Sequence, residues 1–250
     1  MNASVVVPCY NEAKNLPALI ARFEALRTSI SGAAAPNADP DWELVLVDNG
    51  SADDTKEVLA KELASPSRSF VRVATVPSPN VGYGHGIMTG LRAAKGDLLA
   101  WTHADGQTPP SDVLRAFDVI RASRDPDRVF VKGHRRNRPI KDTLFTMGMQ
   151  GVATVLLGEM LSDINGQPKA FTRRLLEKAT DPPVDLSLDL YFFWLAKREG
   201  YAIETFEVRF GDREHGESKW AFNWRSKARN IARSVKFMAA LRTGGDYPRA

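Results

Sequence analysis

Three polar side chains alternate along a short segment and are the first candidates for chemistry. His103, Asp105 and Gln107 follow an apolar run that ends at Trp101. Side chains at positions i and i+2 of an extended segment point the same way, so all three can face one ligand. Carboxylate and amide oxygens suit Mg²⁺ or Mn²⁺ bound to a substrate diphosphate, and an imidazole suits Mn²⁺ better. The pattern predicts a divalent-metal site, with a solvated Asp-Gly turn as the alternative.

The elements that must position these residues alternate between short apolar runs and amphipathic stretches. The apolar runs cover residues 4–8, 43–48, 70–76, 97–101 and 128–131. Continuous apolar strands separated by helices are typical of a parallel sheet covered on both faces. We therefore predict an α/β fold, doubly wound, with a mainly parallel sheet and helices on both faces. Further along, we predict a helix over 187–198 and a strand over 202–210.

Polar segments follow four of the predicted strands. They cover residues 8–12, 48–51, 79–84 and 102–107. Parallel strands end at the same edge of a sheet, and ligands bind beyond that edge. We expect these segments to line one pocket.

Composition limits the class of protein. The 250 residues are 43% hydrophobic and 26% charged, which is typical of a globular domain and excludes a disordered or collagen-like chain. The single cysteine, Cys9, excludes an internal disulfide, and with no basic neighbour in sequence it is expected to be a packed side chain. No secretory signal and no membrane-spanning helix are expected, because no long uncharged apolar stretch occurs. We expect a cytoplasmic location.

Positive charge is concentrated near the C-terminus. The net charge is +4, but residues 219–250 contain eight basic residues against Asp246 alone. We predict a body over 1–218 and a basic amphipathic extension over 219–250. Peripheral binding to the inner face of an anionic membrane is one expectation for this extension. Packing against the body, with snorkelling basic side chains, and nucleic-acid binding are the alternatives.

Common nucleotide motifs do not occur in this sequence. The glycines at 82, 84 and 86 do not match G-x-G-x-x-G, because residue 87 is Ile. There is also no P-loop and no G-x-S-x-G nucleophile elbow. Dinucleotide-dependent oxidoreductases, P-loop NTPases and α/β-hydrolases are therefore disfavoured.

Five spaced motifs together resemble the family 2 inverting glycosyltransferases of the GT-A fold. They are VVVPCYNE at 5–12, VDNGSADDT at 47–55, NVGYG at 80–84, HADGQTPP at 103–110 and FGDREHGESKW at 210–220. The last two are most similar to the dolichyl- or polyprenyl-phosphate sugar synthases, whose corresponding motifs read Asp-Ala-Asp-x-Gln-x-Pro-Pro and Arg-x-x-Gly-x-Ser-Lys. The motifs occur in family order and span most of the chain.

The resemblance implies an enzyme that moves a hexose from a GDP- or UDP-linked donor to a polyprenyl-phosphate or glycan acceptor, with inversion. It implies that Asp105 and Gln107, with His103, hold Mn²⁺ or Mg²⁺ on the donor diphosphate. The nucleotide-sugar pocket that it implies consists of Pro8, Tyr10, Asn11, Glu12, Asp48, Gly84, Asp105, Arg135, Arg213, Ser218 and Lys219. The arginines and Lys219 in this set would contact phosphate, and Asp48 would accept a hydrogen bond from the base.

Two positions depart from the family pattern: Asn49 stands where Asp is common, and the change at position 103 is the larger one. His103 stands where the family has its first Asp, which removes a negative charge and weakens the expected binding of a hard ion. A relative that binds a nucleotide-sugar without turnover is therefore an alternative function. A basic nucleic-acid-binding protein is another, but it leaves the loop motifs unexplained.

Asp189 lies among apolar residues of the helix predicted over 187–198. With Asp105 it is a candidate catalytic residue, as the general base for a hydroxyl acceptor. A phosphate acceptor is already anionic and would need no base. An Asp on the surface of the helix is the alternative interpretation.

Overall fold

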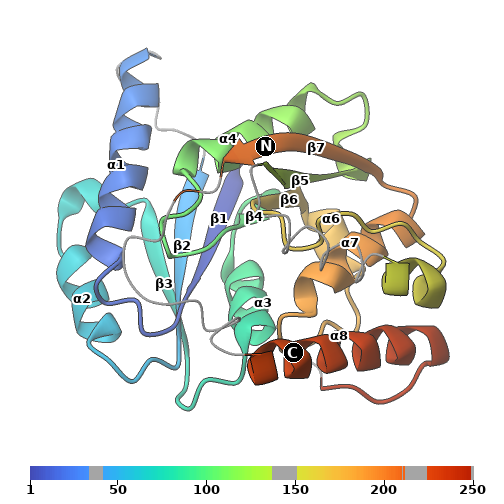
Figure 1. Cartoon of the computed structure of the whole chain (residues 1–250). Coiled ribbons are helices and arrows are strands. Elements are labelled where there is room, and N and C mark those ends of the chain that lie inside the picture. Colours follow the sequence, from blue (N-terminus) through green and yellow to red (C-terminus); the bar gives the residue numbers. More distant parts are fainter. Residues whose placement is uncertain (34–41, 137–150, 210, 212–223, 249–250) are drawn as a thin grey trace.

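A computed structural model describes residues 1–33, 42–136, 151–209, 211 and 224–248 (Figure 1). A seven-stranded sheet of order β3-β2-β1-β4-β6-β5-β7 forms its centre. The strands are β1 (Ala3–Cys9), β2 (Trp42–Asn49), β3 (Val71–Val76), β4 (Leu98–Trp101), β5 (Val129–Arg136), β6 (Lys169–Thr172) and β7 (Ala202–Arg209). All of these strands run in one direction except β6, which is antiparallel to both β4 and β5.

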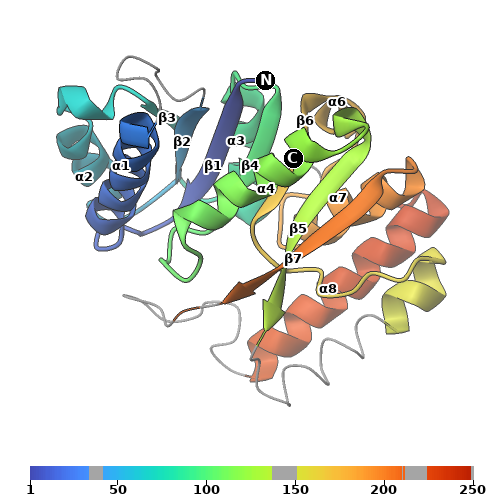
Figure 2. The ribbon, with the colours of Figure 1, turned by 90° about the horizontal axis from the view of Figure 1, so that it is seen from above.

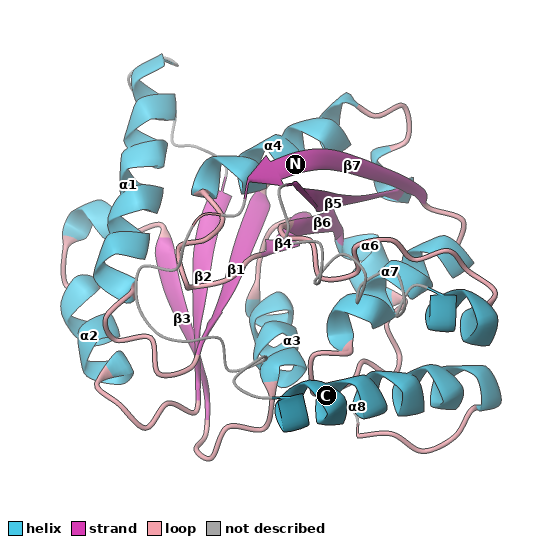
Figure 3. Cartoon of the chain, in the orientation of Figure 1, coloured by secondary structure: helices cyan, strands magenta, loops and turns pink. Residues whose placement is uncertain are grey.

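Helices connect most of these strands (Figure 3). They are α1 (Leu16–Ala33), α2 (Thr55–Glu62), α3 (Tyr83–Ala93), α4 (Pro110–Ala122), α6 (Arg173–Glu177), α7 (Leu188–Arg198) and α8 (Trp224–Thr243). Residues 151–157 are helical as well. Short 3₁₀ turns at Pro66–Arg68 and Pro126–Arg128 precede β3 and β5.

The sheet separates two apolar cores, because successive side chains of a strand point to opposite faces. Val5 and Val7 of β1 pack in the core that contains residues of α1, α2 and α4. Val6 packs in the other core, with residues of α3, α7 and α8. Figure 1 shows α4 above the sheet and α8 below it, and Figure 2 shows the sheet from above. The predicted α/β fold with helices on both faces is confirmed.

β6 is absent from the predicted strands, and its position corrects the predicted strand pattern. It begins with Lys169, which is fully buried and pairs with Trp101 of β4 and with Lys132 of β5. A strand of four residues that starts with a buried lysine does not form the apolar run by which the other strands are recognised. Its antiparallel insertion separates β4 from β5 in the sheet.

α8 contributes to the same core as α7. Phe237 and Met238 are fully buried, and the ring centroid of Phe237 lies 6.3 Å from that of Tyr191 and 4.9 Å from that of Tyr247. The Tyr247 hydroxyl donates to Oδ2 of Asp185 over 2.7 Å, which ties the end of the described chain to the start of α7. The predicted boundary between 1–218 and 219–250 lies outside the described residues. None of the described helices is long and apolar enough to cross a bilayer.

Candidate functional site

The segments that follow β1 and β2 are joined by hydrogen bonds. The Asn11 backbone N–H donates to Oγ of Ser51 over 3.1 Å, and the Ala52 N–H donates to Oδ1 of Asn11 over 2.8 Å. The Glu12 N–H donates to Oγ1 of Thr55 over 2.9 Å. Asn11 has a φ of 57°, in the left-handed region that Asn tolerates better than most residues. The expectation that these two segments meet at one edge is confirmed.

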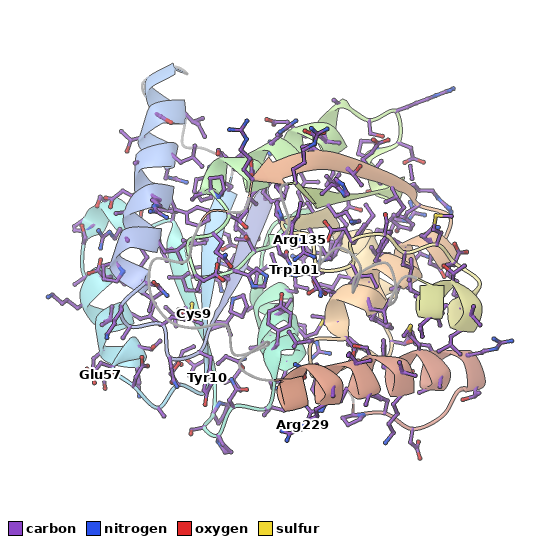
Figure 4. All side chains as sticks on the ribbon, viewed as in Figure 1. Cys9, Tyr10, Glu57, Trp101, Arg135 and Arg229 are labelled. Carbon is purple, nitrogen blue, oxygen red and sulfur yellow. The ribbon has the colours of Figure 1, made fainter. Side chains whose placement is uncertain are left out.

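Two carboxylates lie in this joined region. Glu12 accepts a 2.6 Å hydrogen bond from Nδ2 of Asn15, and the buried Asp48 accepts one from the Ser51 N–H over 3.1 Å. Pro8 lies opposite Val47 in the β1–β2 register, and Tyr10 directly follows the end of β1 (Figure 4 labels Tyr10). Most of the predicted base and ribose pocket is therefore brought together, while the binding role of each residue stays a prediction.

Cys9 lies beneath this region and is completely buried. Its thiol donates to the Val7 carbonyl over 3.4 Å. Burial, with the charge of Glu12, raises the pKa of the thiol far above its ordinary range. A thiolate is strongly disfavoured, so the expectation of a packed side chain is confirmed.

The start of α3 is held against β2 and against residues 183–185. Nδ2 of Asn49 donates to the Gly82 carbonyl over 3.0 Å. A Cβ at Gly84 would lie 2.3 Å from the Pro183 carbonyl oxygen, so only glycine permits this approach. Gly84, predicted from the resemblance to bind the nucleotide-sugar, thus has a packing role that is visible in the structure.

The predicted metal-binding triplet follows β4 and meets α3. The imidazole of His103 stacks on the ring of Tyr83, with centroids 5.8 Å apart and an interplanar angle of 29°. Asp105 is buried, and its Oδ1 accepts a 3.2 Å hydrogen bond from the Gln107 N–H. Among the described residues, no three His, Cys, Asp or Glu side chains are grouped so as to hold a metal ion. His103 and Asp105 would need oxygens from Gln107, substrate or water to complete a site.

Gln107 links this loop to the end of β7. Its Nε2 donates to the Gly211 carbonyl over 3.0 Å, and the Gly211 N–H donates to the Gln107 carbonyl over 3.0 Å. Three predicted phosphate ligands follow Gly211 closely in sequence: Arg213, Ser218 and Lys219. These three lie outside the described residues, so their contribution stays a prediction.

Arg135 is paired with an acidic residue that the site prediction did not include. Its Nε and Nη2 donate to Oδ1 of Asp163 over 2.9 and 2.5 Å, and its backbone N–H donates to Oδ2 over 2.8 Å. Burial tends to raise the pKa of Asp163, but the bonds from Arg135 outweigh it and hold this pKa below its ordinary value. In this structure the guanidinium therefore binds Asp163, and its predicted contact with phosphate would use its remaining donors.

Asp189 accepts hydrogen bonds from a buried cluster. Its Oδ1 accepts from Nζ of Lys169 over 2.6 Å, from Nε2 of Gln167 over 3.1 Å and from Nε1 of Trp101 over 3.2 Å. Asp189 is 2% exposed and Lys169 is 0% exposed; Figure 4 labels Trp101 in the interior. The structure therefore places Asp189 in a buried hydrogen-bonded cluster. A general base would have to be accessible to the acceptor, and Asp189 is not.

The predicted site residues do not include Lys169, Gln167 or Tyr83, although Tyr83 belongs to the NVGYG motif at 80–84. The signal that points to Lys169 and Lys132 is a lysine inside or beside an apolar run, since a buried lysine needs a partner. Lys132 meets this condition, because its Nζ donates to the Asp163 carbonyl over 2.9 Å.

A cavity of about 350 Å³ lies at the carboxyl ends of β5 and β7. Its lining consists of Arg115, Arg136, Glu207, Val208 and Arg209. Arg136 pairs with Glu207, and the Arg115 guanidinium lies 4.6 Å from the ring centroid of Phe206. Three arginines against one glutamate give this hollow a positive charge that suits an anionic group.

The class of architecture is a doubly wound α/β fold whose polar loops are joined at one sheet edge, and comparison with known proteins identifies the family. The family model described as Glycosyl transferase family 2 matches residues 4–180. The chain belongs to this family. An undecaprenyl-phosphate 4-deoxy-4-formamido-L-arabinose transferase of Pectobacterium carotovorum is 28% identical over 232 residues, covering 88% of this chain and 63% of that protein. Its counterpart in Salmonella enteritidis is 29% identical over 230 residues, covering 88% and 62%. The chain thus spans less than two thirds of the length of these relatives.

Solved structures share the fold. Glucosyl-3-phosphoglycerate synthase of Mycobacterium tuberculosis, in complex with Mn²⁺, UDP and glucosyl-3-phosphoglycerate, matches with a TM-score of 0.65 and 20% identity, over 100% of this chain and 81% of that one. A mannosyltransferase of Pyrobaculum calidifontis, in complex with GDP-Man and Mn²⁺, matches with a TM-score of 0.61 and 23% identity, over 99% and 66%. The predicted GT-A fold is confirmed.

Proposed function

We propose that this chain is an inverting glycosyltransferase that moves a sugar from a nucleotide-diphosphate donor to a polyprenyl-phosphate acceptor. The observation that carries the proposal is the junction of the segments after β1, β2 and β4 at one sheet edge, through Asn11–Ser51, Asn49–Gly82 and Tyr83–His103. Family membership and the names of the curated relatives support it.

The donor is proposed to occupy the edge between β1 and β4. Tyr10 and Glu12 lie beside the base and ribose, and Asp48 faces the base. The diphosphate lies toward Asp105, where α3 begins. Either GDP or UDP fits this assignment, since the solved neighbours bind one or the other.

A divalent cation fits the loop after β4. Asp105 supplies a carboxylate, Gln107 an amide and His103 an imidazole, a donor set that suits Mn²⁺ better than Mg²⁺. When bound, the cation would stabilise the charge that develops on the departing diphosphate. The presence of Mn²⁺ with nucleotide in two solved neighbours supports this assignment.

A phosphate acceptor fits the placement of Asp189. An anionic phosphate oxygen attacks the anomeric carbon without losing a proton, so no general base is needed. Asp189, the base predicted from sequence, is 2% exposed and already accepts a hydrogen bond from Lys169. The arginine-lined cavity at the ends of β5 and β7 offers positive charge for the acceptor phosphate at the same edge of the sheet.

A lipid-linked acceptor requires contact with a membrane surface, and α8 has a suitable face. Arg229, Arg233 and Lys236 are exposed at spacings of four and three residues, which places them along one side of the helix. Exposed basic side chains along one side of an amphipathic helix suit peripheral binding to an anionic bilayer.

A family member that binds a nucleotide-sugar without turnover is the second candidate. The replacement of the family's first Asp by His103 favours it, because one negative charge is lost where the cation would bind. Measurable transfer or hydrolysis of a nucleotide-sugar would exclude this candidate.

The test begins with thermal unfolding of the protein with GDP- and UDP-linked sugars, each with and without Mn²⁺, since a ligand that binds only the folded state raises its Tm. The donor identified in this way is then prepared with a radiolabelled sugar and incubated with the protein, polyprenyl phosphate and detergent. We expect label in the organic extract. Label only in water-soluble glycan would overturn the proposed acceptor, and no Tm shift with any donor would overturn the proposed function.

A further inference from the structure

Tyr83 lies where the buried cluster around Asp189 meets the loop after β4. It is the first residue of α3 and is partly buried. One face of that ring stacks on the imidazole of His103. Its other end reaches the interior, where Nε2 of Gln167 lies 3.4 Å from the Tyr83 hydroxyl.

The hydroxyl of Tyr83 is connected to the buried cluster through Gln167. Nε2 of Gln167 lies 3.4 Å from this hydroxyl and also donates to Oδ1 of Asp189 over 3.1 Å. Gln167 is completely buried, so a tilt of the Tyr83 ring would disturb a contact with a fixed side chain.

The cluster that fixes this hydroxyl is itself rigidly connected. Asp189 belongs to α7, Lys169 to β6 and Trp101 to β4, and the three side chains meet at Oδ1 of Asp189. Lys169 also donates to the Gly166 carbonyl over 3.1 Å. Trp101 precedes His103 by two residues. The chain is therefore fixed at two nearby points: the Trp101 indole donates to Asp189, and the His103 imidazole stacks on Tyr83.

We propose that Tyr83 is a positioning residue that holds the His103 imidazole in place for the metal–nucleotide complex. The inference rests on the proposed function, since it assumes that a nucleotide diphosphate binds beside Asp105. Free in solvent, the imidazole would sample several rotamers, and fixing it would cost binding free energy each time the ligand binds. The stack on Tyr83 removes most of that cost in advance. His103, which replaces the usual carboxylate, is therefore held by the Tyr83 ring, and Tyr83 in turn contacts the buried core.

The experiment is a double-mutant cycle on affinity. The Kd of UDP or GDP, whichever binds, is measured calorimetrically in the presence of Mn²⁺ for the wild type, Tyr83→Leu, His103→Ala and the double variant. Tyr83→Leu removes the ring and is expected to raise the Kd about three- to tenfold. In the His103→Ala background the same substitution is expected to change the Kd by less than about twofold, because the residue through which Tyr83 acts is gone.

Controls separate positioning from general destabilisation. Tyr201→Phe removes a hydroxyl from a buried tyrosine directly before β7 and is expected to leave the Kd unchanged. Tyr83→Phe keeps the ring, is the substitute if Tyr83→Leu does not fold, and is expected to give a smaller loss that again disappears with His103→Ala. Equal losses in both backgrounds would overturn the inference. Absence of nucleotide binding by the wild type would overturn the proposed function instead.

Discussion

Nζ of Lys169 lies 2.6 Å from Oδ1 of Asp189, and both side chains are almost completely buried. This ion pair joins β6, which was not predicted from the sequence, to α7, which was predicted. Because the pair is shielded from water, its two members depend on one another. Substitutions of Lys169 and Asp189 are therefore expected to affect stability and catalysis differently.

Removing one member of this pair is expected to be strongly destabilising. Lys169→Met leaves the Asp189 carboxylate buried without its cation and should lower the free energy of unfolding by about 3–5 kcal/mol. The double variant Lys169→Met/Asp189→Leu should recover much of this loss, because no uncompensated charge remains. Urea denaturation measures both, and a loss below about 1 kcal/mol for the single variant would contradict the prediction.

The Asp189→Asn variant distinguishes a structural role of Asp189 from a role as general base. A structural role predicts a lower Tm with kcat retained in the folded protein at saturating donor. Loss of a general base would instead lower kcat by about 10²–10⁴-fold. Steady-state kinetics at a temperature well below the Tm distinguish the two outcomes.

Lys132 should make the free energy of unfolding depend on pH in the alkaline range. Burial, partly opposed by Asp163, lowers its pKa to about 8, whereas 10.5 is the ordinary value for lysine. Between these two values the unfolded chain binds more protons than the folded protein, so the free energy of unfolding rises with pH. The contribution reaches about 3 kcal/mol, because each unit of pKa difference corresponds to about 1.36 kcal/mol.

Lys132→Met is the matched variant for this test. Urea denaturation of both proteins from pH 7.5 to pH 10.5 should give a wild-type minus variant difference that rises with pH. A flat difference would show that Lys132 keeps an ordinary pKa in the folded protein.

Asn11 combines a left-handed backbone with a side-chain hydrogen bond, and two substitutions separate these roles. Both Asn11→Gly and Asn11→Ala lose the bond to the Ala52 N–H, but only alanine opposes the φ of 57°. Asn11→Ala should therefore be less stable than Asn11→Gly by about 1 kcal/mol. Equal stabilities by thermal denaturation would mean that the backbone conformation at this residue imposes no constraint.

Asp105→Asn should abolish the Mn²⁺-dependent part of the Tm shift produced by a nucleotide-sugar, since the carboxylate is the only anionic donor of the triplet. The matched control is Asp118→Asn on α4, whose side chain is 73% exposed and pairs with Arg121. The control should keep the full shift. A full shift in Asp105→Asn would place the cation elsewhere.

The basic side of α8 should contribute to binding of anionic vesicles. Changing Arg229, Arg233 and Lys236 to Gln should weaken binding to vesicles containing phosphatidylglycerol by about fivefold per charge. The matched control changes three exposed cations elsewhere: Lys56, Lys61 and Arg121. Equal losses in a sedimentation assay would show that net charge, and not this face, governs binding.

Much of the donor side of the site could be predicted from sequence. Parallel strands necessarily end together, so the segments after β1 and β2 were expected to meet, and the Asn11–Ser51 bond shows that they do. The network around Asp189 could not be predicted, because Lys169, Gln167 and Trp101 are distant in sequence from α7 and only the packing of β6 beside β4 brings them to one oxygen.

The amino-acid sequence by itself determined the α/β layering, the common edge of the polar segments and the family, since apolar periodicity and local motifs are properties of neighbouring residues. The tertiary structure alone decided which of those polar side chains are accessible. Asp189 looks like a reactive carboxylate in the sequence, but long-range packing buries it and surrounds its Oδ1 with donors from Lys169, Gln167 and Trp101. Exposure and partner choice depend on contacts between distant segments, which no local pattern contains.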